Sequence, residues 1–321
     1  MKYINSVYYC GAWGEGLDKI PEKTLKSLDI LYFSNADISG DSVKFNNDCD
    51  AEKVTALKEK APHLKVVLSS VGMTDLPQNI SAMEEGARRL AEAALKYGFD
   101  GVDVDWEFPT HETAPLHTSF MRYLREFLGD DKLVTLACPT TEWAFDIMEL
   151  CECAGFCDYI NMMSYDCYSE RPITCDHSAP LPQSDAPYPC ASLKENIELF
   201  ISKGIPPKNI IGGCAFYSRV WHNVKGKDGY KAEVGVGADY GPKFRDLTPE
   251  YTEQNGFKFS RGENLAPRLY NGYDFITYDD EISIEAKCKL CHEYDIAGLM
   301  AWEYACDTAD NKLINLMREK L

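Results

Sequence analysis

The sequence predicts a (β/α)₈ barrel, because eight short apolar runs recur along its 321 residues with helical patterns between them. The runs are rich in Val, Ile and Tyr, which favours strands of one parallel sheet. They are SVYYC (6–10), ILYFS (30–34), KVVLSS (65–70), GVDVDW (101–106), LVTLAC (133–138), DYINMMS (158–164), IIGGCAF (210–216) and AGLMAW (297–302). A doubly wound open sheet is the alternative, but no run is followed by the Gly-x-Gly-x-x-Gly turn that would hold a dinucleotide.

The strongest helical pattern covers residues 81–98, SAMEEGARRLAEAALKYG. Ser81 and Glu84 have the spacing of a capping box, and Gly98 stands where a helix stop belongs. Apolar residues recur along it at helical spacing: Met83, Ala87, Leu90 and Ala94.

The interval between the seventh and eighth runs is too long and too irregular for one crossover helix. It contains KGKDGY, GVGADYGP and NGYDF, which are rich in glycine and tyrosine. We therefore expect a small α+β insertion domain at 222–275 on the rim of the barrel, and the barrel itself at 1–221 and 276–321.

The composition excludes several classes of partner. The net charge of −18 argues against nucleic acid and against an anionic membrane surface, whereas a neutral substrate is compatible with it. Residues 1–12 lack the pattern of a secretory signal, and the 13 cysteines are scattered through apparent core segments. We expect reduced thiols and a cytoplasmic protein, with removal of an export signal as the open alternative.

One predicted strand carries acids, in the segment FDGVDVDWEFP at 99–109. Alternate side chains of a strand share a face, so Asp103, Asp105 and Glu107 point one way. The opposite face then holds Val102, Val104 and Trp106. A solvated edge-strand face is the alternative, but a helix ending at Gly98 leads into this strand, which favours an interior position.

Three carboxyl groups crowded at a barrel mouth cannot all ionise, since burial and like charges raise at least one pKa. A carboxylic acid that stays protonated near neutral pH is the general acid that glycosidic bond cleavage needs. Glu107 comes last along the strand, at the end where barrel active sites lie. It is therefore the candidate acid.

The same segment resembles the Asp-x-x-Asp-x-Asp-x-Glu signature of glycoside hydrolase family 18, the chitinases and their relatives, with all four acidic positions intact. The resemblance extends over almost the whole chain, and it implies a barrel with a chitinase-type insertion domain. Further matching segments are INMMSYD (160–166), GGCAFYSRVW (212–221), ITYDDEISIEAK (276–287) and AGLMAWEYACD (297–307).

The resemblance implies a substrate-assisted mechanism with net retention. Glu107 would protonate the glycosidic oxygen, and the 2-acetamido oxygen of the substrate would attack the anomeric carbon to give an oxazolinium intermediate. Asp105 would accept the acetamido N–H and share a proton with Asp103. Tyr165 would hold the acetamido oxygen, and Asp166 would contact the distorted sugar. No metal or organic cofactor is expected.

The resemblance also supplies substrate-binding candidates near the C-terminal ends of the strands, with Trp302 as the sugar platform. In SSVGM (69–73) one glycine of the third-strand motif is replaced, so either Ser69 or Ser70 matches its serine, and Met73 replaces an aromatic. The full set of candidates is Tyr8, Ser70, Trp106, Met163, Tyr217, Arg219 and Trp302.

Other signals are weaker. Cys288, Cys291 and His292 match a haem-attachment pattern, but the cysteines fall at core positions of the expected last helix. Cys151, Cys153 and Cys157 lack a second pair for a metal. His177 is expected to be a solvated loop histidine. Three tryptophans that follow strands could stack on sugars or pack in the core, and the sequence leaves this open: Trp13, Trp143 and Trp221.

The main functional prediction is a retaining hydrolase of chitin or chitooligosaccharides, whose partner is an N-acetylglucosamine chain. An endo-β-N-acetylglucosaminidase that acts on glycoprotein or cell-wall glycans is the alternative among enzymes. A non-catalytic chitin-binding lectin is the alternative from another class, although such lectins typically lack the acid that Glu107 supplies.

Overall fold

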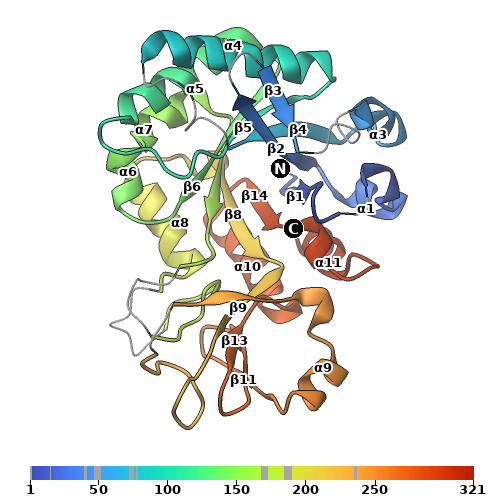
Figure 1. The fold of residues 1–321 in the computed structure, drawn as a ribbon, viewed down its shortest axis with the longest axis vertical. Helices are drawn as coiled ribbons and strands as arrows, with labels where there is room; N and C mark the ends of the chain where they lie inside the picture. The colour runs from blue at the N-terminus through green and yellow to red at the C-terminus, as the bar shows by residue number, and fades with distance from the viewer. Residues whose placement is uncertain are drawn as a thin grey trace.

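The computed structural model describes residues 2–14, 16–39, 42–46, 52–71, 76, 79–167, 173–183, 190–234 and 237–321. Its main body is a closed barrel of eight parallel strands surrounded by helices (Figure 1), as the sequence predicts. Each predicted run coincides with one barrel strand. The strands are β1 (Ile4–Cys10), β2 (Ile30–Ser39), β4 (Lys65–Ser70), β5 (Gly101–Val104), β6 (Leu133–Pro139), β7 (Tyr159–Met163), β8 (Ile210–Ala215) and β14 (Gly298–Trp302). A short strand, β3 (Ser42–Phe45), pairs antiparallel with the end of β2.

The helices around the barrel follow the strands in the expected alternation. They are α1 (Glu22–Ser27), α3 (Val54–Lys60), α4 (Ile80–Lys96), α5 (Ala114–Leu128), α6 (Trp143–Ile147), α7 (Leu150–Cys153), α8 (Leu193–Ser202), α10 (Glu281–Tyr294) and α11 (Lys312–Lys320).

Helix α4 begins two residues earlier than the capping-box prediction. Its N-cap is Asn79, whose side chain accepts a hydrogen bond from the Ala82 N–H at 3.0 Å. The Ser81 and Glu84 box is therefore wrong, because both residues lie inside the helix and Asn79 caps it. The stop at Gly98 is confirmed, since this glycine has a φ of 77°, which side chains disfavour.

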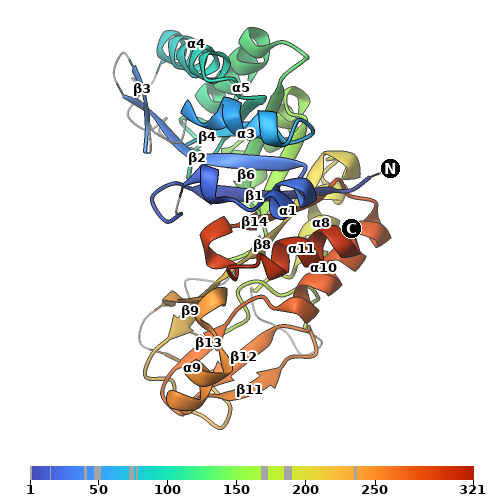
Figure 2. The ribbon, with the colours of Figure 1, turned by 90° about the vertical axis from the view of Figure 1, so that its right-hand side faces the viewer.

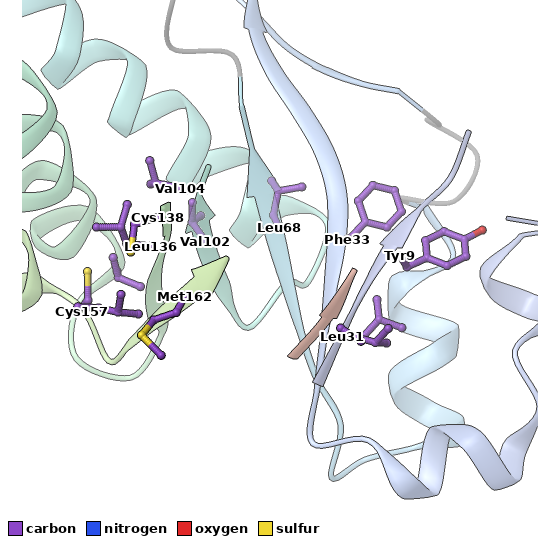
Figure 3. Close-up of a cluster of buried hydrophobic side chains, with 14 of the residues drawn as sticks. Tyr9, Leu31, Phe33, Leu68, Val102, Val104, Leu136, Cys138, Cys157 and Met162 are labelled. Carbon is purple, nitrogen blue, oxygen red and sulfur yellow. The ribbon is translucent and has the colours of Figure 1, made fainter. Parts of the chain in front are cut away.

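The two-residue period of the strands divides the apolar side chains into two cores. One face of each strand points into the barrel, where Tyr8, Tyr32, Val67, Ile211 and Met300 pack together. The other face packs against the helices, and Figure 3 shows part of that larger cluster. It includes Tyr9, Leu31, Phe33, Leu68, Val102, Val104, Leu136, Cys138, Cys157 and Met162.

His117 is buried in the outer core, on α5. Its Nδ1 lies 3.2 Å from the Met148 carbonyl oxygen, and its ring meets the edge of Trp106 with the ring centres 5.9 Å apart. Burial lowers the pKa of His117 from 6.5 to about 4, although the contact with Met148 opposes this. The folded protein therefore keeps His117 neutral over a range of pH in which the unfolded chain binds a proton.

We expect this histidine to make the protein acid-sensitive. Between pH 6.5 and pH 4 the unfolded state binds one proton more than the folded state, so stability falls as the pH falls. At about 1.4 kcal/mol per pH unit, His117 accounts for a loss of about 3 kcal/mol. Urea unfolding at pH 7 and pH 4 should show that loss in the wild type relative to His117→Gln, whose amide can still donate to Met148. An equal stability difference between the two proteins at both pH values would contradict the assignment.

A second sheet lies at one end of the molecule, below the barrel in Figures 1 and 2. It is antiparallel in the order β10-β9-β13-β12-β11. Two of its inner strands, β9 and β13, reach beyond the predicted interval 222–275, where they pair with each other at the junction with the barrel. The elements are β9 (Tyr217–Trp221), β10 (Asp239–Lys243), α9 (Pro249–Gln254), β11 (Lys258–Arg261), β12 (Pro267–Tyr270) and β13 (Phe275–Thr277).

Two cysteines are joined in a disulfide, Cys175 to Cys190, with a sequence separation of 15. The prediction that all cysteines are reduced is wrong for this pair, because the fold brings their Cα atoms within 6.6 Å. The expectation of a cytoplasmic protein loses part of its support, since such bonds persist in oxidising compartments. The ten other described cysteines are free thiols, and Cys49 lies outside the described residues. Cys288 and Cys291 are buried in α10, so their interpretation as core residues is confirmed.

Within the described ranges, no helix combines the length and apolar character that a bilayer crossing requires.

Candidate active site

A cleft of about 410 Å³ opens at the C-terminal ends of the barrel strands. Its size is typical of a small-ligand site. Eight of the twelve predicted site residues line it: Tyr8, Asp105, Glu107, Met163, Tyr165, Asp166, Tyr217 and Trp302. The other four, Asp103, Ser70, Trp106 and Arg219, lie behind its walls.

Asp103 lies at the floor of the barrel mouth with no exposed surface. Burial raises the pKa of this carboxyl above its ordinary value, although its hydrogen bonds oppose the rise. Both of its oxygens are occupied, so it has no place for a proton shared with Asp105, which the resemblance implied. The donors come from four other strands: Tyr8 Oη at 2.9 Å, Ser69 Oγ at 2.9 Å, Thr135 Oγ1 at 2.5 Å and Asn161 Nδ2 at 3.1 Å.

Asp105 instead shares a side-chain hydrogen bond with Glu107. Burial raises the pKa of both groups, and for Asp105 the charges of Glu107 and Asp103 raise it further, to well above its ordinary value. The pair therefore keeps a proton to a higher pH than an isolated carboxyl group does. Strand β5 ends at Val104, so both residues stand on the segment that leaves the strand, and Glu107 is exposed at the mouth of the cleft. The other Asp105 oxygen, Oδ1, is buried and has no hydrogen-bond partner among the described residues.

The strand register decides which serine belongs to the site. Ser69 pairs with Asp103 across β4 and β5, so its hydroxyl points into the barrel and reaches that carboxylate. Ser70 pairs with Val104 on the outward face, and its carbonyl oxygen accepts the Asp105 N–H at 2.9 Å. The choice of Ser70 as the site serine is therefore corrected to Ser69.

Asp166 is held as an anion beside the cleft. It accepts hydrogen bonds from Tyr217 Oη at 2.7 Å, from Arg219 Nε at 2.6 Å and from His177 Nδ1 at 3.1 Å. Burial alone would raise the pKa of Asp166, but the hydrogen bonds from Arg219 and His177 outweigh it and hold the pKa well below its ordinary value. Its backbone has a φ of 54°, a left-handed conformation that aspartate adopts more readily than most residues.

Two predicted substrate-binding residues have other positions. Trp106 is only 4% exposed and packs against His117 in the outer core just beyond the end of β5, so its assignment to substrate binding is corrected. Arg219 does not line the cleft either. Its guanidinium binds Asp166 and supports the ring of Tyr240, whose centre lies 3.7 Å from the Arg219 Cζ.

The walls of the cleft are aromatic. Phe108 and Trp143 meet edge to face with ring centres 5.5 Å apart, and both are exposed, as is Tyr240 from β10. Trp13 is exposed beside Trp302, at 6.0 Å between ring centres, but it does not line the cleft. Trp221 is buried in the core of the second sheet. Of the three tryptophans that the sequence could not assign, Trp13 and Trp143 are therefore exposed and Trp221 is a core residue. Met73 lies outside the described residues.

The sequence predictions omitted several residues of the site. Thr135 and Asn161 could have been found, because each is a polar residue on the inward face of a buried strand. Phe108 follows the acidic motif directly. Tyr240 carried no local signal, since it reaches the cleft only through the pairing of β10 with β9.

Among the described residues no cluster of histidine, cysteine and carboxylate side chains could hold a metal ion, and the prediction that no cofactor is needed stays a prediction. The site offers instead a carboxyl pair that holds a proton, a buried acceptor oxygen, a fixed anion and aromatic walls. These groups can protonate a leaving oxygen, accept an N–H and stack against sugar rings.

A protonated carboxyl pair under an aromatic cleft, at the mouth of a (β/α)₈ barrel, is the kind of site that glycoside hydrolases have. The model of the Glycosyl hydrolases family 18 matches residues 5–307, and the chain belongs to that family.

Curated relatives carry chitinase names at modest identity. The chain is 28% identical to chitinase A1 of Niallia circulans, over 92% of this chain and 48% of that protein. It is 26% identical to chitotriosidase-1 of Mus musculus, over 87% of this chain and 68% of that protein. The chain thus spans about half the length of the first of these relatives.

A solved structure from Paenibacillus barengoltzii, a family 18 N-acetylglucosaminidase, matches with a TM-score of 0.92 and 27% identity over the full length of both chains. Human YKL-39, described as a pseudo-chitinase with retained chitooligosaccharide binding, matches with a TM-score of 0.85 over 99% of both chains. Its 19% identity shows a shared fold alone.

Proposed function

We propose that this chain is a retaining hydrolase of β-1,4-linked N-acetylglucosamine chains that uses the 2-acetamido group of its substrate as the nucleophile. The observation that carries the proposal is the Asp105–Glu107 pair, which holds a proton under an aromatic cleft and leaves one buried Asp105 oxygen without a partner among the described residues.

The arrangement of the carboxyl groups supports a nucleophile from the substrate. In the usual two-carboxylate schemes the groups stand about 5–5.5 Å apart for retention or about 6.5–9.5 Å apart for inversion. Asp105 and Glu107 are hydrogen-bonded to each other, which is too close for either scheme. Asp103 has both oxygens occupied, and Asp166 is bound to Arg219, Tyr217 and His177. Neither is a free nucleophile.

In this mechanism Glu107 protonates the glycosidic oxygen as the acetamido oxygen attacks the anomeric carbon. Asp105 Oδ1 accepts the acetamido N–H, which orients the group and stabilises the positive charge of the oxazolinium intermediate. Tyr165 donates its hydroxyl to the acetamido oxygen. Burial and the charges of Asp105 and Glu107 raise the pKa of Tyr165 well above its ordinary value, so that hydroxyl keeps its proton. Glu107 then takes a proton from the attacking water.

Chitin or chitooligosaccharides are the substrates we propose, because the curated relatives carry chitinase names. An endo-β-N-acetylglucosaminidase that acts on glycoprotein or cell-wall glycans is the alternative within the same chemistry. A chitin-binding lectin is the alternative outside it, and one structural neighbour is described as a pseudo-chitinase.

The 2-acetamido group should decide whether a substrate is cleaved. We expect chromogenic glycosides of N-acetylglucosamine oligomers to be cleaved and the matching glucose oligomers to be inert, because only the former carry the nucleophile. The measurement is the release of the chromophore by each pair of glycosides at equal concentration.

Product analysis on defined N-acetylglucosamine oligomers and on a glycoprotein separates the two enzymatic alternatives. Cleavage of the glucose series at a comparable rate would contradict the mechanism. Binding of the N-acetylglucosamine series without any cleavage would identify a lectin instead.

A further inference from the structure

His177 is not the solvated loop histidine that the sequence predicts. It has no exposed surface, and its Nδ1 lies 3.1 Å from Asp166 Oδ1. Its ring lies 5.4 Å from the ring of Tyr217, which binds the other oxygen of the same carboxylate. The prediction was wrong because the residues on either side of His177 contact the second sheet and α10, which are distant in sequence.

Both residues beside His177 in the chain are held by a buried ion pair. Asp176 forms one with Arg268, and Ser178 bonds to another between other residues. Asp176 accepts a hydrogen bond from Arg268 Nε at 2.7 Å and from Asn264 Nδ2 at 2.8 Å, both in the second-sheet region. Arg268 belongs to β12, so this pair links the loop to the insertion.

On the other side, Ser178 bonds to Asp279 Oδ2 at 2.7 Å and to Lys287 Nζ at 2.7 Å. Lys287 and Asp279 themselves lie 2.6 Å apart with no exposed side-chain surface. The segment 176–178 is therefore anchored to the insertion at one end and to α10 at the other. His177 has little freedom to turn away from Asp166.

The geometry assigns the proton on the ring. Nδ1 lies 3.1 Å from Asp166 Oδ1, and the backbone N–H of Asp166 points at the same nitrogen from 3.4 Å. Nδ1 can donate to the carboxylate or accept from this N–H, but not both, and the shorter contact to a charged oxygen favours the first. A bare Nδ1 would place its lone pair against a carboxylate oxygen, which is repulsive at the shorter of these distances. Nδ1 therefore carries a hydrogen and donates it to Asp166. Nε2 is buried and has no hydrogen-bond partner in the part of the chain that the structure describes.

We propose that His177 is a positioning residue for the reaction, which holds the Asp166 carboxylate in place for the distorted sugar and connects it to the insertion. This inference rests on the proposed function. Asp166 adopts a left-handed backbone, so contacts from outside its own strand must fix its direction. Arg219 and Tyr217 approach it from β9, and His177 approaches from the loop that Arg268 of β12 anchors. The second sheet thus holds Asp166 in two ways, directly through β9 and indirectly through His177.

The test compares two substitutions of His177 with one at a matched site. His177→Leu removes the donor and fills much of the same volume, whereas the Nδ2 of His177→Asn can take the place of Nδ1. His117→Leu is the control, because His117 is also fully buried and its Nε2 has no partner among the described residues, but it packs against Trp106 in the outer core.

We expect His177→Leu to lower kcat on N-acetylglucosamine oligomers about tenfold with KM changed less than threefold, because the contact matters most for the distorted sugar. His177→Asn should recover kcat to within threefold of the wild type. His117→Leu should lower the melting temperature without lowering kcat. The inference is overturned if folded His177→Leu keeps the wild-type kcat, or if Asn and Leu lower kcat equally.

A ligand-free measurement keeps this inference separate from the proposed function. Imidazole ¹⁵N NMR should show a proton on Nδ1 of His177, and Asp166→Ala should shift that signal. An unshifted signal overturns the contact whether or not the wild type cleaves a sugar. An inactive wild type with a shifted signal refutes the proposed function and leaves the positioning contact intact.

Discussion

Replacing Glu107 with glutamine should lower kcat on N-acetylglucosamine oligomers by roughly 10²- to 10⁴-fold, the usual contribution of a general acid. Glutamine has nearly the same shape, and its amide N–H can donate to Asp105 in place of the shared proton. The variant should therefore stay folded and bind the oligomers with an affinity within a few fold of the wild type. Single-turnover kinetics and calorimetric titration measure the two quantities.

The control for Glu107→Gln is Glu142→Gln, which removes one negative charge beside the cleft. Glu142 is 76% exposed and pairs with Lys203, and it does not line the cleft. Its substitution should leave kcat within twofold of the wild type. Wild-type turnover by Glu107→Gln would refute the assignment of the acid.

Replacing Lys287 with methionine should lower the free energy of unfolding by about 3–5 kcal/mol, because it leaves a buried charge without its partner. Lys287 Nζ lies 2.6 Å from Asp279 Oδ2, and neither side chain is exposed. Asp279 also accepts hydrogen bonds from the Ala215 N–H and from Ser283 Oγ, so it joins β8, α10 and the end of the second sheet. Urea unfolding measures the loss.

Lys289→Met is the matched control, because it makes the same substitution two residues further along α10. Lys289 is 73% exposed and forms a surface pair with Glu285 at 3.0 Å. Such pairs contribute less than about 1 kcal/mol. If the two methionine variants lose equal stability, the buried pair contributes no more than a surface pair.

The barrel could be predicted from the sequence because every strand is buried between neighbouring strands and helices, so each one leaves a short apolar run in the sequence. The eight apolar runs have the length of strands, and the alternation in FDGVDVDWEFP separates Asp103 from Val102 and Val104 by face alone. The second sheet was predicted only in outline. Its first strand, β9, follows β8 after a single residue, Phe216, and only pairing with β13 reveals that the chain has left the barrel.

The site could be predicted as a set of residues but not as a set of contacts. The two-residue period turns both Asp103 and Asp105 inward, yet it does not say which carboxyl group shares a proton. That depends on donors from β1, β4, β6 and β7, which occupy Asp103 and leave Asp105 to pair with Glu107. The same reason explains the exchange of Ser70 for Ser69, which the register of β4 against β5 decides.

The sequence alone thus determined the barrel, the acidic strand and the place of Glu107 at its end, because local periodicity controls which side chains share a face. The tertiary structure decided the rest: the partner of each carboxyl group, the burial of His177 and the approach of Tyr240 to the cleft. These features depend on contacts between segments up to about a hundred residues apart, and on the burial that such contacts produce. No local pattern encodes a pKa that burial and distant charges set.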